Sequence, residues 1–341
     1  MVGRDLEKCS LVAVVGATNA GKSTLINELV GFKASIVTPK VHTTRVRMNA
    51  VRNDGNVQLV FTDTPGVFAP KTVLEKFLVK NAWMSIRGAD IVVLVLEARN
   101  YLCGQVARVI AKVKHSHIPT VAVLNKTDLL QECRIREILA HVRSMHEFTG
   151  VFAVSALHGL GTEALLTHLR ESAGYCPWLY PGTQRTDATV EFFVAEITRE
   201  KLFLALRQEL PYSLSVVTEK FEDKGRSVII KQVVYVIKES QKTIVVGKNA
   251  ALIKSVSTVA REEIGQMLGR VVDGGVTAKR EAMADYHLEV TSGQNQFLRQ
   301  PFHKIVTISF LRADIRRDLG CEHFTLREIR SGGLCPPQKE S

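Results

Sequence analysis

Gly16-Ala17-Thr18-Asn19-Ala20-Gly21-Lys22-Ser23 fits the pattern Gly-x-x-x-x-Gly-Lys-Ser/Thr of a phosphate-binding loop. The apolar run 11–15 before it predicts a buried strand, and 24–30 after it predicts a short helix that ends at Gly31. Backbone N–H groups of such a loop surround the α and β phosphates of a nucleotide, at the positive end of the helix dipole. We expect Lys22 to reach the β and γ phosphates and the Ser23 hydroxyl to hold Mg²⁺.

A second motif, Asp63-Thr64-Pro65-Gly66, follows the apolar segment 57–62, which predicts another strand. A carboxylate at the end of that strand can hold Mg²⁺ through water, and the Gly66 N–H can touch the γ-phosphate. The two motifs together therefore predict a nucleoside triphosphate site with a magnesium ion.

A third motif, Asn125-Lys126-Thr127-Asp128, follows the apolar segment 121–124. The Asp128 carboxylate can accept both the N1–H and the exocyclic N2–H₂ of guanine, a pair of donors that adenine lacks. The aliphatic stem of Lys126 can lie over the base, while Asn125 ties the loop together. These residues favour guanine as the base.

The fourth motif, Ser155-Ala156-Leu157, follows the strand predicted over 151–154, and its backbone can address the guanine O6. All four motifs come in order, each at the carboxyl end of an apolar strand, which is where α/β sheets bind ligands. The sequence therefore predicts an α/β P-loop GTPase domain of the Ras-like type, which binds GTP and GDP.

The switch segments carry residues that bear on hydrolysis and on the Mg²⁺ shell. Val67 stands where Ras-like GTPases carry a glutamine that orients the attacking water, so we expect slow hydrolysis or another means of orienting that water. Thr43 and Thr44, before a strand predicted over 46–52, are candidates to complete the Mg²⁺ shell, and we favour Thr44. The alternative is that both are ordinary residues at the entry to a strand.

Asn19 and two arginines leave further alternatives open. Asn19 either tolerates a left-handed turn or places its amide oxygen near the phosphates to help bind a monovalent cation. Arg45 or Arg47 could supply the arginine that some GTPases use in hydrolysis, but the sequence does not show it.

Length and composition are typical of a two-domain protein of a reducing, cytoplasmic compartment. A chain of 341 residues predicts about two domains, and no apolar run approaches the ~20 residues of a membrane span. The start has no apolar segment typical of a secretory signal. Six cysteines without Cys-x-x-Cys pairs favour free thiols over zinc or disulfides.

A net charge of +11 indicates nucleic acid or an acidic membrane as partner, although solvated lysines explain it as well.

Two prolines and a glycine within 175–183 mark a domain boundary. Beyond it the expected elements, in chain order, are an amphipathic helix over 194–210, strands over 213–220 and 227–238 with a turn over 222–225, an apolar segment over 243–246, and a helix that continues to 268. This order resembles a KH module, which clamps a single-stranded nucleic-acid backbone with a Gly-x-x-Gly loop.

The loop of the KH-like part reads Gly247-Lys248-Asn249-Ala250, with alanine where the second glycine is expected. If that position needs a positive φ, the extra methyl group costs stability. Lys248 and Lys254 can compensate by attracting phosphates.

Over residues 8 to 292 the chain resembles the Era family, bacterial GTPases that join a Ras-like domain to a C-terminal type II KH domain. The resemblance implies binding to the 3′ end of 16S rRNA, assistance in small (30S) subunit maturation, a monomeric cytoplasmic protein, and peripheral association with the inner membrane. It also implies Mg²⁺, and K⁺ through Asn19. The motifs that carry it are Gly16 to Ser23, 42–45, Asp63 to Gly66, Asn125 to Asp128, Ser155 to Leu157, 199–202 and 209–213.

On this reading the chain has a G domain over 1–176, a linker over 177–190, a KH domain over 191–292 and an extra tail over 293–341. Residues 270–279, where the family closes its KH sheet, contain Asp-Gly-Gly and predict a weak or bulged strand. The basic tail is either an RNA-binding addition or a divergent segment. A rival interpretation of the whole chain is a signalling or membrane-recruited GTPase whose second domain binds protein or lipid.

Overall fold

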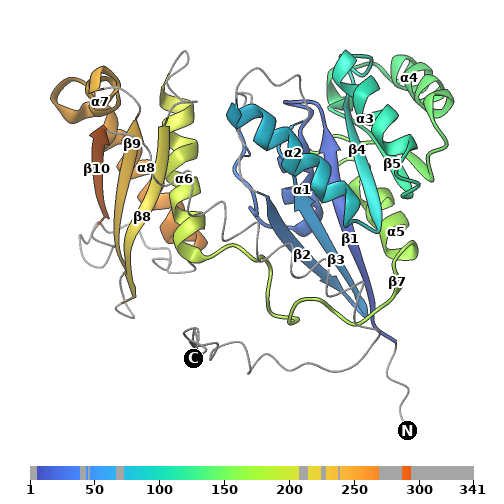
Figure 1. The fold of residues 1–341 in the computed structure, drawn as a ribbon, viewed down its shortest axis with the longest axis horizontal. Helices are drawn as coiled ribbons and strands as arrows, with labels where there is room; N and C mark the ends of the chain where they lie inside the picture. The colour runs from blue at the N-terminus through green and yellow to red at the C-terminus, as the bar shows by residue number, and fades with distance from the viewer. Residues whose placement is uncertain are drawn as a thin grey trace, which may run out of the picture. The chain divides into compact units, whose positions relative to one another are not determined.

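The computed structural model describes residues 6–38, 44, 47–66, 73–206, 214–223, 228–236, 239–268 and 286–292. The strands in this part of the chain form two separate sheets, one of seven strands and one of three (Figure 1). Each sheet has its own helices and its own apolar core. The Ras-like and KH-like halves expected from the sequence therefore correspond to two different layered structures.

The first sheet has the order β2-β3-β1-β4-β5-β6, with β7 paired to β1. The contacts of β1 with β3 and β4, of β4 with β5 and of β5 with β6 are parallel, so these five strands end at one edge. The two antiparallel strands are β2 and β7. The strands are β1 (Lys8–Gly16), β2 (Met48–Asp54), β3 (Val57–Asp63), β4 (Ile91–Glu97), β5 (Thr120–Asn125), β6 (Gly150–Ala153) and β7 (Gly174–Tyr175).

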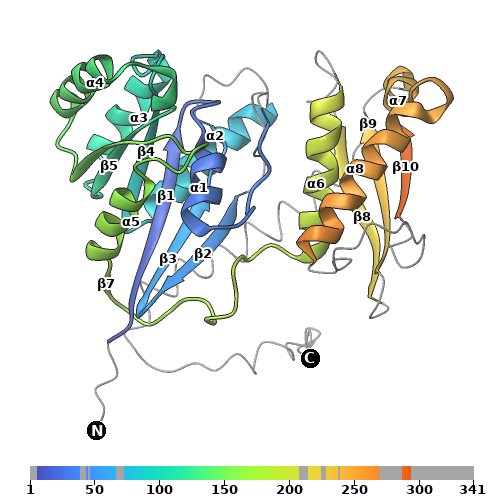
Figure 2. The same cartoon turned by 180° about the vertical axis from the view of Figure 1, so that it is seen from behind.

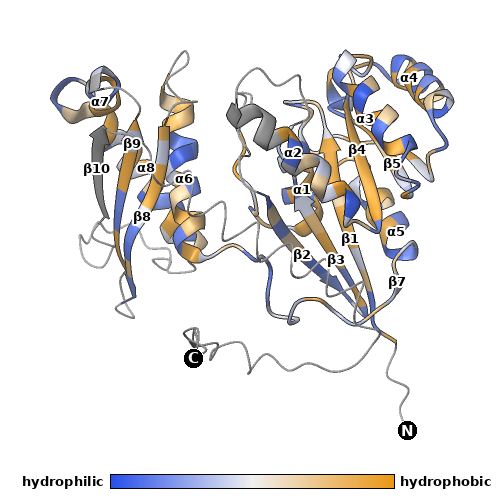
Figure 3. Cartoon of the chain, viewed as in Figure 1, coloured by the Kyte–Doolittle hydropathy of each residue, from blue (hydrophilic) through white to orange (hydrophobic). Residues whose placement is uncertain are grey.

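Helices cover both faces of this sheet because its central strands are apolar on both sides (Figure 3). Alternate residues of β1 enter different cores: Val12 and Val14 pack with α1 and α5, whereas Ala13 and Val15 pack with α2, α3 and α4. Figures 1 and 2 show these two layers from opposite sides. The helices are α1 (Lys22–Val30), α2 (Val73–Arg87), α3 (Gly104–Lys114), α4 (Glu132–Met145) and α5 (Thr162–Glu171), with a 3₁₀ turn η1 (Thr127–Leu129).

The strands predicted before each motif are confirmed within one residue at each end, except that β1 begins at Lys8, three residues earlier than predicted. The helix after the phosphate loop begins at Lys22, two residues earlier than predicted, and ends at Gly31 with φ 74° as expected. The strand predicted over 46–52 is β2, shifted to Met48–Asp54.

The segment that follows β7 is held against the edge of the first sheet. Gln58 on β3, fully buried, donates from Nε2 to the Tyr180 carbonyl at 2.9 Å and accepts from the Leu179 and Tyr180 N–H groups at 2.9 and 3.0 Å. Further along, Val51 N donates to the Arg185 carbonyl at 2.7 Å. The stretch expected as a linker is therefore fixed to β2 and β3 over much of its length.

The second sheet has the order β10-β9-β8, with β8 antiparallel and β10 parallel to β9. Helices α6 and α8 pack on it through residues such as Leu202, Val256 and Ile264. Its elements are α6 (Val190–Ala205), β8 (Leu214–Asp223), β9 (Val228–Val236), α7 (Glu239–Val246), η3 (Lys248–Ala250), α8 (Ala251–Met267) and β10 (Tyr286–Ser292).

Several predicted bounds in this half were wrong. Helix α6 ends at Ala205 rather than at 210, with Leu206 still buried, and β8 continues through Glu222 and Asp223, where we predicted a turn. The apolar segment 243–246 is the end of helix α7. The third strand is β10, over 286–292, which the sequence did not indicate; the weak strand predicted over 270–279 lies outside the described residues, as does the tail from 293.

Candidate functional site

The phosphate loop runs from the end of β1 to the start of α1, where the sequence placed it. Asn19 and Gly21 have positive φ values of 61° and 90°. A Cβ on Gly21 would lie 2.3 Å from Asn125 Nδ2, and one on Gly66 would lie 2.8 Å from Thr18 Cγ2. Glycine is therefore required at both positions, and the loop lies in direct contact with the motifs at the ends of β3 and β5.

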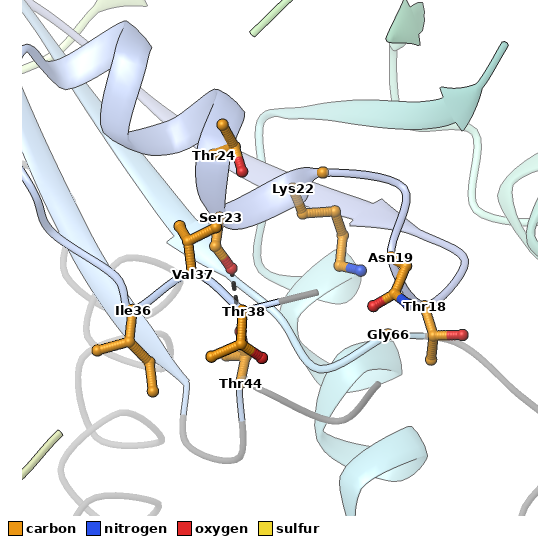
Figure 4. Close-up of a pocket in the computed structure, with 11 residues that line it drawn as sticks. Thr18, Asn19, Lys22, Ser23, Thr24, Ile36, Val37, Thr38, Thr44 and Gly66 are labelled. Carbon is orange, nitrogen blue, oxygen red and sulfur yellow. Dashed lines mark hydrogen bonds between the residues drawn. The ribbon is translucent and has the colours of Figure 1, made fainter. Parts of the chain in front are cut away.

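The pocket beside the loop is lined by parts of three of the predicted motifs (Figure 4). Ile36, Val37 and Thr38 also line it, and sequence reasoning missed them because they match no motif. The only sequence signal for them is their place between α1 and the switch segment. The lining residues are Thr18, Asn19, Gly21, Lys22, Ser23, Thr24, Ile36, Val37, Thr38, Thr44 and Gly66.

Lys22 is buried, and its ammonium folds back onto the loop. Its Nζ donates to the Ala17 carbonyl at 2.9 Å and to the Gly16 carbonyl at 3.4 Å. Burial lowers the pKa of Lys22 to about 8, and the nearby Asp63 carboxylate opposes that shift. A nucleotide phosphate would offer this ammonium a stronger acceptor than the two carbonyls do.

Three oxygen-bearing side chains converge next to Lys22. The Ser23 hydroxyl donates to Asp63 Oδ2 at 2.9 Å, and Thr44 Oγ1 lies 3.1 Å from both Ser23 Oγ and Asp63 Oδ2. Burial raises the pKa of Asp63, and the charge of Lys22 and the neighbouring hydroxyls oppose that shift. Asp63 Oδ1 is buried without a hydrogen bond among the described residues. Two hydroxyl oxygens and a carboxylate oxygen without a hydrogen bond are the kind of ligands that Mg²⁺ prefers.

The structure thus brings together Ser23, Asp63 and Thr44, the three residues that we favoured for magnesium. Thr43, Val67 and Arg45 lie outside the described residues. Arg47 does not line the pocket; its guanidinium is buried near Asp187, whose charge opposes the lowering of the Arg47 pKa by burial. Thr64 donates to the Val14 carbonyl at 2.7 Å and so fixes the start of its loop to β1.

The base-recognition motifs meet at the ends of β5 and β6. Asn125 donates from Nδ2 to the Ala20 carbonyl at 2.9 Å and accepts from the Ala156 N–H at 3.0 Å, so it ties three loops together as expected. The Ser155 hydroxyl donates to Asp128 Oδ1 at 2.5 Å. This bond orients the Asp128 carboxylate, while Leu157 is 73% exposed.

The KH-like loop lies between α7 and α8. Gly247, Asn249 and Ala250 have positive φ values of 75°, 53° and 58°. Lys248, in η3, and Lys254, in the first turn of α8, are exposed. Ala250 thus has a positive φ, the conformation in which we expect its methyl group to cost stability.

Comparisons with known proteins support both the GTPase domain in the first half of the chain and the KH domain in the second. A family described as "50S ribosome-binding GTPase" matches residues 11–126, and a KH domain family matches residues 209–276. GTPase Era of Ehrlichia ruminantium (strain Gardel) is 52% identical over 268 residues, covering 78% of this chain and 90% of that protein. GTPase Era of Rhizobium meliloti (strain 1021) is 43% identical over 266 residues, covering 78% of this chain and 85% of that protein.

Two solved structures are similar over nearly their whole length. Era in complex with MgGDPNP and nucleotides 1506–1542 of 16S ribosomal RNA has a TM-score of 0.79 at 29% identity, covering 88% of this chain and 98% of that one. Aquifex aeolicus Era bound to GDP and AlF₄⁻ has the same TM-score at 28% identity, covering 87% and 98%.

The fold and the site define a P-loop GTPase with a C-terminal KH domain. With a relative at 52% identity over most of both chains, this chain belongs to the Era family of GTPases.

Proposed function

We propose that this chain is a GTP-controlled RNA-binding protein that recognises the 3′ end of 16S rRNA and assists maturation of the small (30S) ribosomal subunit. The observation that carries the proposal is the presence of a pocket beside the phosphate loop and an exposed basic KH loop in one chain. The solved relative that held both MgGDPNP and a 16S rRNA fragment supports the same pairing of ligands.

We assign the RNA backbone to the loop of Gly247, Lys248, Asn249 and Ala250. Gly247 has no space for a side chain, because a Cβ there would lie 2.9 Å from Leu252 Cβ. The exposed ammonium groups of Lys248 and Lys254 suit two phosphates of a single strand.

Nucleotide control of RNA binding has a candidate route through Glu200. Val37 lines the nucleotide pocket, and its N–H donates to Glu200 Oε1 at 2.8 Å. Glu200 belongs to α6, the first helix of the KH-like half, and its side chain is only 4% exposed. Lys33, just after α1, pairs with the same carboxylate at 2.5 Å. A change in the segment before the switch residues would therefore act directly on α6.

For the cofactors, we assign Mg²⁺ to Ser23, Asp63 and Thr44, where the ion would neutralise charge on the β and γ phosphates. We assign K⁺ to the Asn19 amide oxygen.

The domain bounds that we propose are those expected from the sequence: 1–176, 177–190, 191–292 and 293–341. We further propose a monomer in the cytoplasm, with peripheral contact to the inner membrane through its net positive charge of +11. In the part of the chain that the structure describes, no helix has the length and apolarity to cross a bilayer.

The test is binding of a single-stranded RNA with the sequence of the 16S rRNA 3′ end, measured with GDP and with a non-hydrolysable GTP analogue. We expect tighter binding with the analogue, by about 10-fold, which corresponds to a coupling free energy of ~1.4 kcal/mol. Charge reversal of Lys248 and Lys254 together should weaken binding in both nucleotide states and reduce its salt dependence.

Charge reversal of Lys112 and Lys114, exposed near the end of α3, is the matched control, because it removes the same charge elsewhere. RNA affinity that is equal in both nucleotide states and unaffected at Lys248 and Lys254 would favour the rival class, a GTPase whose second domain binds protein or lipid.

A further inference from the structure

Glu97 and Lys126 form an ion pair that none of the sequence motifs explains. Lys126 Nζ lies 3.0 Å from Glu97 Oε1, and the two side chains are 32% and 27% exposed. A pair this accessible to water contributes little to stability. Its place beside the base-recognition motif suggests a role in binding instead.

The backbone fixes where both side chains start. Glu97 is the last residue of β4 and pairs in register with Asn125, the last residue of β5. The Ala98 N–H donates to the Asn125 carbonyl at 2.9 Å, which locks the two strand ends together. Lys126 follows with a left-handed backbone at φ 63° and ψ 38°, and its carbonyl accepts from the Leu129 N–H at 3.2 Å.

The stem of Lys126 runs between the phosphate loop and Glu97. A Cβ on Gly21 would lie 4.0 Å from Lys126 Cε, so the end of the stem passes over this glycine before the ammonium reaches the carboxylate. A long, flexible lysine side chain loses conformational entropy when it is fixed in one arrangement. A carboxylate that holds its ammonium fixes the stem before the nucleotide binds, and so reduces the entropy lost on binding.

We propose that Glu97 is a positioning residue for the purine base: it holds Lys126 so that the aliphatic stem forms one wall of the base site. This inference rests on the proposed assignment of Asn125, Lys126 and Asp128 to guanine. Glu97 acts through Lys126 and needs no contact with the nucleotide itself.

The test is a double-mutant cycle on the release rate of a fluorescent GDP from the full chain. Lys126→Met keeps an unbranched apolar stem and removes the charge, and Glu97→Gln removes the partner. We expect Glu97→Gln to speed release by about 3- to 10-fold in the wild-type background and to have no effect in the Lys126→Met background. Raising the salt concentration should speed release more from the wild-type protein than from Glu97→Gln, because only the first has the Glu97–Lys126 ion pair to screen.

Glu137→Gln is the matched control, since Glu137 pairs with Arg134 at 2.6 Å on the exposed side of α4. Unchanged release from Glu97→Gln, or an equal acceleration in both backgrounds, overturns the inference, because the second result shows a general loss of structure. Asp128→Asn serves as a separate arm. If Asp128→Asn and Lys126→Met speed release but Glu97→Gln does not, only the inference about Glu97 is wrong. If none of the three variants speeds release, the assignment of these residues to guanine is wrong as well.

Discussion

Asn19 has the left-handed backbone conformation in the middle of the phosphate loop, at φ 61°. Asparagine adopts this conformation more readily than most residues, so loop geometry alone accounts for its presence. The side chain nevertheless lies beside Lys22 at the pocket, where an amide oxygen could meet a cation (Figure 4). The two explanations differ in what they require of the side chain.

Asn19→Gly separates them, because glycine keeps the positive φ and removes the amide. If Asn19 binds K⁺, we expect GTP hydrolysis by the wild-type protein to be about 10-fold faster in potassium than in sodium, a difference of ~1.4 kcal/mol in barrier height. The variant should hydrolyse GTP at the wild-type sodium rate in both salts. A variant that is still stimulated by potassium would leave Asn19 with a role in loop geometry only.

Burial of Lys22 and Asp63 in the pocket is electrostatically unfavourable for both charges. Burial lowers the pKa of Lys22 to about 8 and raises that of Asp63, and in each case the charge of the other residue opposes the shift. Each charged form is therefore poorly solvated and only partly paired. A phosphate for Lys22 and a metal ion for Asp63 would supply the missing partners, which favours binding of the two ligands together.

At the scale of single elements, the loop before α8 contains three residues with positive φ that set its direction. Gly247 and the left-handed Asn249 and Ala250 turn the chain from α7 into α8 within four residues. Asparagine and glycine tolerate positive φ, but alanine does so at a cost of ~1–2 kcal/mol. The loop is therefore strained at Ala250, the residue just before α8.

Ala250→Gly should relieve this strain. We expect the free energy of unfolding to rise by about 0.5–1 kcal/mol, less than the full strain because glycine loses more backbone entropy on folding. The measurement is the midpoint of thermal unfolding, with RNA affinity recorded alongside. RNA binding should be unchanged or tighter, since the substitution removes a methyl group from the proposed backbone contact.

The adjacent Ala251→Gly is the control, because Ala251 has helical angles of φ −63° and ψ −42°. At that position glycine should destabilise the chain by about 0.5–1 kcal/mol. If both variants lower the midpoint equally, strain at Ala250 does not limit stability.

At the scale of the whole molecule, a group of four charged residues connects the loop after α1 with α6 and α8. Glu263 on α8 forms ion pairs with both Lys33 and Lys201, and Glu200 pairs with the same two lysines. Partial burial would raise the pKa of Glu263, but its hydrogen bonds with Lys201 and Lys33 outweigh that effect and hold the pKa below 4.5. A carboxylate with a lowered pKa stabilises the folded chain only while it is ionised.

Glu263→Gln should therefore lower the free energy of unfolding by about 1 kcal/mol at pH 7. The stabilisation by Glu263 is fully present above pH 4.5 and is lost as the pH falls through its folded pKa, so the two proteins should converge in stability in more acidic solution. Denaturant titrations at a series of pH values measure this difference.

Glu262→Gln, at the exposed neighbouring position, should leave stability within ~0.5 kcal/mol of the wild type at every pH. A destabilisation by Glu263→Gln that stays constant down to pH 3 would show that the effect is one of packing rather than of charge.

The sequence predicted the GTPase half well because its motifs are local. Gly16 to Ser23, Asp63 to Gly66 and Asn125 to Asp128 each follow an apolar strand, and parallel strands must end at the same edge of a sheet. It predicted the KH half less well. The end of α6, the helical state of 243–246 and the position of β10 depend on packing between segments far apart in the chain, which periodicity does not report.

The sequence by itself determined the class of nucleotide and the family to which the chain belongs, because backbone N–H groups, a lysine and a carboxylate recognise phosphate and guanine through short fixed spacings. Only the tertiary structure decided which distant groups support those residues. Glu97 meets Lys126, Gln58 holds Tyr180, and Glu200 receives the Val37 N–H. These contacts join residues 29 to 163 positions apart, and no local pattern encodes them, because they arise only when strands and helices pack together.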